Sequence, residues 1–167
     1  MEVRRAETDA DLDAVRRLFH SFLAWHRQRH VEDLHLIDAY FDDEAYEREI
    51  KGLPGEYAPP DGDLLVCHHG GLAVGCGAFR RLDGHSCEMK RMYVAPTARR
   101  GGGGRALATE LVVRARARGY RRMYLDTSIR QVEAIALYRD LGFEEVEPYY
   151  DVPEAMLGWL SFFGRDL

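Results

Sequence analysis

Apolar residues recur at two different spacings along the chain, which divides it into a helical first part and a strand-rich middle. Val3 to Ala6 is typical of a short strand, and Thr8 or Asp9 begins a helix with an apolar stripe. The stripe consists of Leu12, Val15, Leu18, Phe19, Phe22 and Leu23. A second helix is expected from Ile37 to Ile50, and the prolines and glycines of residues 53–62 then indicate a loop.

Beyond the loop the pattern becomes that of strands. Turns that contain glycine separate three strand candidates, which are Asp63–His68, Leu72–Leu82 and Ser86–Val94. Helical and strand patterns then alternate: a helix through Leu107 and Ala115 that ends at Gly119, a strand Arg122–Asp126, a helix Gln131–Leu141 and a last strand Leu157–Phe163. An antiparallel meander followed by this alternation predicts a mixed sheet with at least one parallel crossover.

The composition is that of a globular protein. The 167 residues are 46% hydrophobic and 31% charged, and this length favours one domain. No apolar run is long enough to span a bilayer, and Met1 to Arg5 leads into acidic sequence without an apolar segment. Cys67, Cys76 and Cys87 lack C-x-x-C spacing and are expected to be buried thiols. We therefore expect a cytoplasmic protein without a membrane partner.

Charge is distributed in three blocks. Residues 1–90 carry 11 Lys and Arg against 18 Asp and Glu, residues 91–130 carry 10 against 2, and residues 131–167 carry 2 against 8. Such blocks are typical of solvated faces, but they also fit a middle that binds a polyanion. An RNA-binding module is disfavoured, because the basic block has few aromatic residues to stack on bases and the chain is net acidic. No nucleic-acid partner is expected.

The most informative segment runs from Tyr93 to Leu107, where a strand leads through four consecutive glycines into a helix. Glycine lets the backbone approach a ligand closely, and the N–H groups of a first helical turn favour an anion such as pyrophosphate. The segment lacks the Gly-Lys-Ser/Thr of a P-loop, and it lies too late in the chain for a dinucleotide-binding fingerprint. A glycine loop without a ligand is the remaining alternative.

Two motifs lie in this part of the chain. The first is Val94-Ala95-Pro96 followed by Arg99-Arg100-Gly101-Gly102-Gly103-Gly104, and the second is Leu137-Tyr138 followed by Gly142-Phe143. Both resemble the signatures of the GNAT superfamily of acetyl-CoA-dependent N-acetyltransferases. The resemblance covers roughly residues 63–147, whereas residues 1–60 match only in general plan. The chain departs from the family pattern at Gly103, where a branched apolar residue is common, and at Gln131, where asparagine is common.

The resemblance implies an α/β fold of GNAT type, in which a mixed, largely antiparallel sheet is flanked by helices and a splayed parallel strand pair holds the cofactor. It implies one N-acetyltransferase domain over residues 1–167, acetyl-CoA as the co-substrate and no metal. The backbone of Met92 and Val94 is expected to pair with pantetheine, and the pyrophosphate is expected at Gly101, Gly102, Gly103 and Gly104. Arg99, Arg100 and Arg105 are candidates for the 3′-phosphate, and Gln131 and Tyr138 complete the expected cofactor contacts.

Two residues are candidates for catalysis. Tyr138 occupies the position that, by resemblance, protonates the coenzyme A thiolate, with a core tyrosine as the alternative. Glu88 is the candidate base for the amine, and a structural ion pair with Lys90 or an arginine explains it equally well. Strand alternation places Glu88, Lys90, Met92 and Val94 on one face of the sheet. The histidines at 68, 69 and 85 lie in turns, and their spacing resembles no metal site.

The expected function is transfer of an acetyl group from acetyl-CoA to a primary amine by direct attack. The alternative is a non-catalytic acyl-CoA-binding sensor or scaffold with the same fold. The acceptor is a small-molecule or peptide amine, expected to be cationic because acidic residues are abundant between Glu32 and Glu49 and between Glu145 and Glu154. A homodimer is possible through the apolar tail, which consists of Trp159, Leu160, Phe162 and Phe163.

Overall fold

The computed structural model describes residues 1–167, apart from the side chain of Arg100. Seven strands form one sheet in the order β1-β2-β3-β4-β5-β7-β6. The strands are β1 (Glu2–Arg5), β2 (Asp63–His69), β3 (Leu72–Arg81), β4 (Ser86–Val94), β5 (Arg122–Ser128), β6 (Glu144–Glu145) and β7 (Leu160–Asp166). The helices are α1 (Asp9–Arg29), α2 (Leu34–Tyr40), α3 (Asp43–Lys51), α4 (Gly103–Ala117) and α5 (Val132–Asp140).

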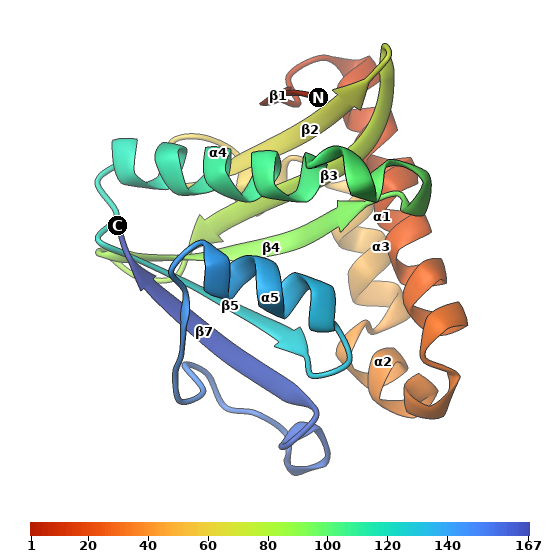
Figure 1. Ribbon diagram of the computed structural model, residues 1–167, viewed down its shortest axis with the longest axis vertical. Coiled ribbons are helices and arrows are strands. Elements are labelled where there is room, and N and C mark those ends of the chain that lie inside the picture. Colours follow the sequence, from red (N-terminus) through yellow and green to blue (C-terminus); the bar gives the residue numbers. More distant parts are fainter.

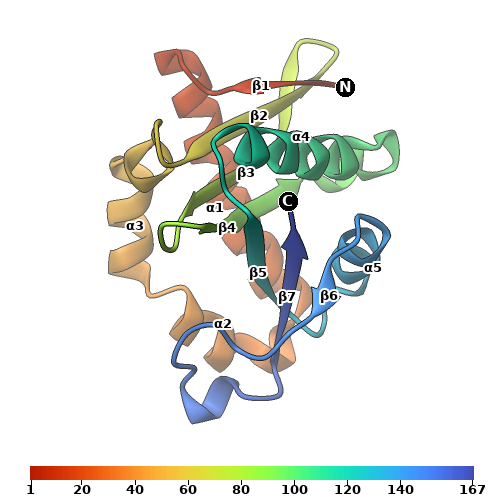
Figure 2. The same cartoon turned by 90° about the vertical axis from the view of Figure 1, so that its left-hand side faces the viewer.

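Helices cover both faces of the sheet. Helices α1, α2 and α3 lie against one face, and α4 and α5 lie against the other (Figures 1 and 2). Each face has its own buried apolar cluster. The strands pair antiparallel except for β4 and β5, which are parallel. The predicted fold class, a mixed and largely antiparallel sheet flanked by helices, is confirmed.

The first helix begins and buries its apolar stripe as its sequence predicts. The Thr8 hydroxyl accepts a hydrogen bond from the backbone N–H of Asp11, and the Asp11 carboxylate accepts one from the backbone N–H of Thr8. This reciprocal cap satisfies two backbone donors and contributes about 1 kcal/mol. Asp11 also pairs with Arg4 of β1 at 2.6 Å, so the same carboxylate ties the helix to the edge strand.

The second predicted helix is wrong as a single element. Residues 37–50 form parts of two helices, α2 and α3, with a break at Phe41 and Asp42. The Asp42 carboxylate accepts a hydrogen bond from the backbone N–H of Ala45 and so starts a new helix. Phe41 is buried against the first cluster, so the break turns an aromatic side chain inward at the end of α2.

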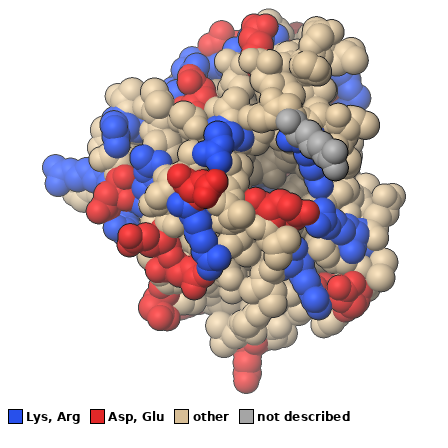
Figure 3. Space-filling view, viewed as in Figure 1, with Lys and Arg blue, Asp and Glu red and all other residues tan. Residues whose placement is uncertain are grey.

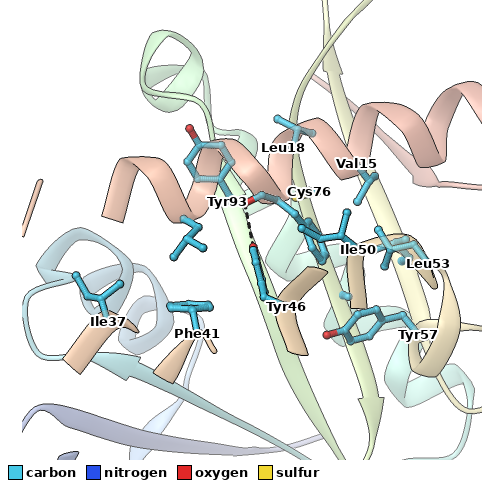
Figure 4. Close-up of a cluster of buried hydrophobic side chains, with 14 of the residues drawn as sticks. Val15, Leu18, Ile37, Phe41, Tyr46, Ile50, Leu53, Tyr57, Cys76 and Tyr93 are labelled. Carbon is cyan, nitrogen blue, oxygen red and sulfur yellow. Dashed lines mark hydrogen bonds between the residues drawn. The ribbon is translucent and has the colours of Figure 1, made fainter. Parts of the chain in front are cut away.

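The buried cluster beneath α1 and α3 combines aliphatic and aromatic side chains (Figure 4). Val15 and Ile50 are less than 3% exposed, and burying each stabilises the fold by about 1.5–3 kcal/mol. The Tyr46 hydroxyl, also buried, donates a hydrogen bond to the backbone carbonyl of Phe19 at 2.9 Å. The three cysteines are buried free thiols, as predicted.

The C-terminal strand lies inside the sheet. Gly158, with φ of +81°, makes a turn, so the strand begins at Leu160, later than the predicted Leu157. Strand β7 pairs with β5 on one side and β6 on the other. The apolar tail therefore packs in the chain's own core, where its four members are at most 8% exposed. This removes the sequence argument for a homodimer, which stays a prediction.

None of the helices described is long and apolar enough to cross a membrane.

Candidate functional site

The two parallel strands separate soon after they begin. Their ladder contains three pairs, the last of which joins Glu88 to Tyr124. Beyond that point β5 continues along β7, and β4 diverges from it (Figure 1). From Met89 to Val94 the edge of β4 that faces β5 therefore has no strand partner in the described sheet. Apart from the Val94 carbonyl, which accepts a hydrogen bond from Arg99 Nε, the backbone N–H and C=O groups along this edge are available to an extended ligand.

A β-bulge at Arg91 changes which side chains of β4 share a face. Cys76 pairs with Tyr93 and Ala78 pairs with Lys90, so that Arg91 and Met92 together oppose the single residue between them on β3. Arg91 adopts φ of +57° at this point. The predicted alternation is therefore wrong beyond the bulge.

The side chains before and after the bulge point to opposite faces of the sheet. Glu88 and Lys90 face α2 and the C-terminal segment, where Lys90 lies 3.0 Å from the Tyr40 hydroxyl. Met92 and Val94 pack with the cluster beneath α4. Gly77 makes room for this arrangement, since a Cβ there would lie 2.5 Å from the Met92 sulfur.

A cavity of about 660 Å³ fills the gap between the diverging strands. Its walls are the β4 segment from Met89 to Val94, the loop before α4, the end of β5 from Asp126 to Ser128, and the first two turns of α5. Six aromatic residues complete it on the α1 and α2 side, and we call them the aromatic wall: Phe22, Trp25, Tyr40, Phe41, Tyr93 and Trp159. The cavity thus joins an open strand edge to an aromatic surface.

The predicted glycine loop lies at one end of the cavity. Gly102 and Gly104 line it, and Gly102 has φ of +80°, a conformation that favours glycine. Gly103 is buried beside Cys67 and Val94, although a Cβ there would make only ordinary contacts, and a Cβ at Gly101 would meet the flexible end of Met1. Two of the glycines, Gly102 and Gly104, therefore face the cavity. Helix α4 begins at Gly103, so the N–H groups of its first turn face a site suited to phosphate.

The arginines of this loop differ in their surroundings. Arg99 lines the cavity, where its Nε donates to the Val94 carbonyl at 3.0 Å and its guanidinium lies 4.0 Å from the centre of the Trp25 ring. Arg105 also lines the cavity and pairs with Asp140 at 2.9 Å. The third predicted arginine, Arg100, has its side chain outside the described residues.

Tyr138 lies on α5 and lines the cavity. Its ring packs against Phe143 and Phe163, so it is also the core tyrosine of the alternative interpretation. Burial raises the pKa of the Tyr138 phenol, and the charge of Asp126 raises it further, so the hydroxyl keeps its proton at neutral pH. None of the other described residues forms a hydrogen bond with that hydroxyl. The geometry gives a protonated donor at the cavity wall.

Gln131 precedes α5 and is buried. Its amide nitrogen lies 3.3 Å from both ring nitrogens of His26 and 3.4 Å from His30, both on the α1 side. Burial, with the nearby charges of His30 and Arg99, lowers the pKa of His26 to about 4, so this cavity-lining imidazole is neutral at pH 7. Gln131 thus connects α1 to α5 at the cavity, and its contact with a cofactor stays a prediction.

Glu88 is buried behind the cavity wall. It is 1% exposed, it accepts hydrogen bonds from Arg80 Nε at 2.8 Å and the Tyr149 hydroxyl at 2.7 Å, and Lys90 Nζ lies 3.5 Å away. It does not line the cavity. These contacts are those of the ion-pair interpretation, and the role of Glu88 as a base stays a prediction.

The carboxylate that lines the cavity is Asp126, which sequence reasoning missed. It accepts hydrogen bonds from the hydroxyls of Tyr40 at 2.8 Å and Tyr150 at 2.6 Å, and Lys90 Nζ lies 3.5 Å away. Burial acts to raise the pKa of Asp126, but Lys90 and the two phenols outweigh it, so the pKa is lowered and the group is ionised. Its place at the end of a strand that follows a glycine-opened helix was the available signal.

The acidic residues that suggested a cationic acceptor do not line the cavity. Several of them pair with arginines elsewhere: Asp38 and Asp43 with Arg27, Asp33 with Arg130, and Glu49 with Arg91. Among the described residues no three His, Cys, Asp or Glu side chains are grouped to hold a metal ion. The acidic residues that do line the cavity are Asp126 and Glu133.

Comparison with known proteins identifies the family. The model of the acetyltransferase (GNAT) family matches residues 19–143, which is most of the chain. The chain belongs to the GNAT acetyltransferase family. The resemblance of its two motifs is thereby confirmed, and both lie within the matched region.

Individual proteins similar to this chain are acetyltransferases as well. The chain is 40% identical over 107 residues to an uncharacterized N-acetyltransferase of Schizosaccharomyces pombe, covering 63% of this chain and 66% of that relative. It is 38% identical over 118 residues to an IAA acetyltransferase of Azospirillum brasilense, covering 70% and 74%. A GNAT acetyltransferase from Elizabethkingia anophelis, solved with acetyl-CoA bound, superposes with a TM-score of 0.57 at 17% identity, covering 75% and 83%, and so shares the fold.

Proposed function

We propose that this GNAT protein is an N-acetyltransferase that moves an acetyl group from acetyl-CoA to a primary amine by direct attack. The observation that carries the proposal is the cavity, which joins a free strand edge and a helix N-terminus to a buried phenol and an aromatic surface. A cofactor sensor needs only the first two features. The protonated hydroxyl of Tyr138 and the further space along the aromatic wall favour an enzyme.

The chain's own groups suit acetyl-CoA. The backbone of Met92 and Val94 is placed to pair with pantetheine amides along the free edge of β4. The loop from Gly101 to Gly104 and the first turn of α4 would hold the pyrophosphate, since a helix N-terminus stabilises anions. Arg99 and Arg105 stand at the same end of the cavity and add positive charge. We assign these residues to the cofactor, with Arg100 as a further candidate.

Two groups would act on the thioester. Attack forms a carbon–nitrogen bond and breaks the carbon–sulfur bond, while the amine loses one proton and the thiolate gains one. Tyr138 would donate that proton to sulfur, since its phenol stays protonated at neutral pH. A backbone N–H near Val94 would stabilise the carbonyl oxygen as it becomes negative.

An acceptor that enters as an ammonium must lose one proton before it attacks, in addition to the proton that ends on sulfur, and this first proton requires an acceptor. Glu88 is the carboxylate that the sequence suggests, but it is bound by Arg80 and Tyr149 and does not line the cavity. Asp126 lines the cavity and is ionised. We therefore propose that Asp126 receives the proton, and that Glu88 holds Lys90 and Tyr149 in place beside it.

Release of free thiol from acetyl-CoA, measured over a panel of primary amines, tests the proposal. We expect amine-dependent thiol release and an acetylated product. Calorimetry with coenzyme A, run in parallel, distinguishes the enzyme from the sensor, because a sensor binds the cofactor tightly and releases no thiol with any amine. Such a result would rule out the enzyme and retain the cofactor site.

A further inference from the structure

The part of the cavity that remains for an acceptor is built from aromatic side chains. The aromatic wall comes from α1, α2, β4 and the C-terminal segment, and its rings pack edge to face or tilted against one another. Phe22 is its centre: its ring centroid lies 5.7 Å from that of Phe41 and 5.6 Å from that of Tyr93. Such a surface binds apolar groups by removing them from water.

The faces of two of these rings are already covered by cations of the protein. The Arg91 guanidinium lies 5.3 Å from the centroid of Phe41, and the Arg99 guanidinium lies 4.0 Å from that of Trp25. Lys90 Nζ lies at the hydroxyl edge of Tyr40, 3.0 Å from its oxygen. A ring attracts a cation through the negative charge of its face, and these two faces are occupied. The wall therefore offers apolar contact rather than a cage for further positive charge.

The carboxylates that line the cavity also have basic partners. Asp126 faces Lys90 at 3.5 Å, and Glu133 pairs with Arg29 at 2.7 Å. Asp126 and Glu133 are the two acidic residues among the described residues that line the cavity. Among the described cavity residues a polycationic acceptor would find no unpaired carboxylate for its second and third charges, and Lys90 would repel them.

We infer that the acceptor is a monoamine whose body is aromatic or branched aliphatic, and that the site discriminates against polyamines and aminoglycosides. The inference rests on the proposed acetyl transfer, and names the acceptor class for it. The single amine lies near Asp126, where one proton leaves it, and the apolar body contacts Phe22 and its neighbours. The acceptor is still a cation in bulk water, but its recognition is apolar.

An acceptor panel tests the inference. Phenethylamine and isoamylamine represent the proposed class, spermidine and kanamycin the polycations, and ethylamine an amine too small to contact the wall. We expect kcat/KM for phenethylamine to exceed that for spermidine by at least about tenfold. A higher kcat/KM for spermidine or kanamycin would overturn the inference while leaving the acetyltransferase intact.

Substitutions of Phe22 test whether this side chain contacts the acceptor. Phe22→Ala is expected to lower kcat/KM for phenethylamine roughly tenfold or more and to change that for ethylamine less than about threefold. Leu12→Ala is the matched control, because Leu12 lies on the same helix, is half-buried against the same cluster and does not line the cavity. Phe22→Leu keeps an apolar side chain, is less disruptive to the fold and should retain most activity with isoamylamine. An equal loss with every amine in Phe22→Ala would overturn the proposed contact.

Binding measurements keep the inference separate from the proposed function. Calorimetry with coenzyme A present compares phenethylamine with spermidine whether or not turnover occurs. Tighter binding of phenethylamine without thiol release would support the acceptor class and contradict the proposed reaction. Tighter binding of spermidine would overturn the inference, whatever the rates.

Discussion

The hydroxyl of Tyr138 is the single group whose removal tests the chemistry most directly. Tyr138→Phe keeps the ring that packs against Phe143 and Phe163, and removes only the proton donor. We expect kcat to fall by roughly 10²-fold, the usual effect of losing a general acid, while coenzyme A affinity changes little. Steady-state kinetics and calorimetry on the same preparation measure both quantities. Wild-type turnover in the variant would reduce Tyr138 to a core tyrosine.

Two buried carboxylates on neighbouring strands allow a matched comparison. We expect Asp126→Asn to lower kcat/KM most near neutral pH, and to recover partly as pH rises and the amine loses its proton unaided. We expect Glu88→Gln to lower kcat/KM by one constant factor at every pH, because Glu88 acts through Lys90 and Tyr149. The measurement is the pH profile of both variants beside the wild type. A pH-dependent loss in Glu88→Gln alone would restore Glu88 as the base.

The sequence reveals Tyr138 through a motif but marks Asp126 only by its place at the end of a strand, and the reason is spatial. Tyr138 stands in a motif of adjacent residues that can be recognised locally. Asp126 gains its role from Tyr40, Lys90 and Tyr150, which belong to three other parts of the chain. Only the folded chain brings these groups together, so no local spacing predicts the cluster.

Most elements follow from periodicity, and the exceptions have local causes. The strands of the meander, α1, α4 and α5 lie close to their predicted places. The break between α2 and α3 depends on a capping carboxylate at Asp42, which lies inside an otherwise continuous helical pattern. At the bulge, the Arg91 side chain pairs with Glu49 of α3 at 2.6 Å, a contact between distant parts of the chain. Alternation along one strand cannot show where an extra residue is inserted.

The glycine loop gives a prediction about one element, the start of α4. Gly102→Asp places a carboxylate where we expect phosphate, and Gly102→Asn places an uncharged side chain of the same size. Both meet the strain of φ at +80°, which Asn and Asp tolerate best among larger residues, and a Cβ at this position meets nothing within 4 Å. The difference between them therefore isolates charge.

We expect the Kd for coenzyme A to rise at least about tenfold more in Gly102→Asp than in Gly102→Asn. Calorimetry provides the constants, and the melting temperatures of the two variants check that the loop itself is equally perturbed. Equal affinities would mean that no phosphate lies near Gly102.

At the scale of the molecule, the three charge blocks of the sequence largely become ion pairs between distant segments. Asp63 of β2 is fully buried and contacts Arg5, Arg114 and Arg118 from β1 and from the end of α4. Arg122 similarly pairs with Asp166 across β5 and β7. Charges of both signs are accordingly interspersed on the face shown in Figure 3. The block pattern thus reflects mainly how the chain folds back on itself.

The sheet itself predicts how the whole molecule responds to its cofactor. Strands β1 to β4 and strands β5 to β7 are joined by only three ladder pairs. A ligand that pairs with β4 and packs against β5 and α5 would bind the folded chain and not the unfolded one. It would also connect strands β1 to β4 with strands β5 to β7. At one hundred times its Kd it stabilises the fold by about 2.7 kcal/mol.

For a domain of this length, such stabilisation corresponds to a melting temperature higher by roughly 5–10 °C. We therefore expect acetyl-CoA at that concentration to produce this shift, and Gly102→Asp to lose most of it at the same concentration. Thermal unfolding followed by circular dichroism measures it, with dephospho-coenzyme A as a comparison that lacks only the 3′-phosphate. A smaller shift with that analogue would show that the 3′-phosphate contributes to binding. An unchanged melting temperature with saturating acetyl-CoA would contradict binding between the two parts of the sheet, because any ligand bound there stabilises the folded state over the unfolded one.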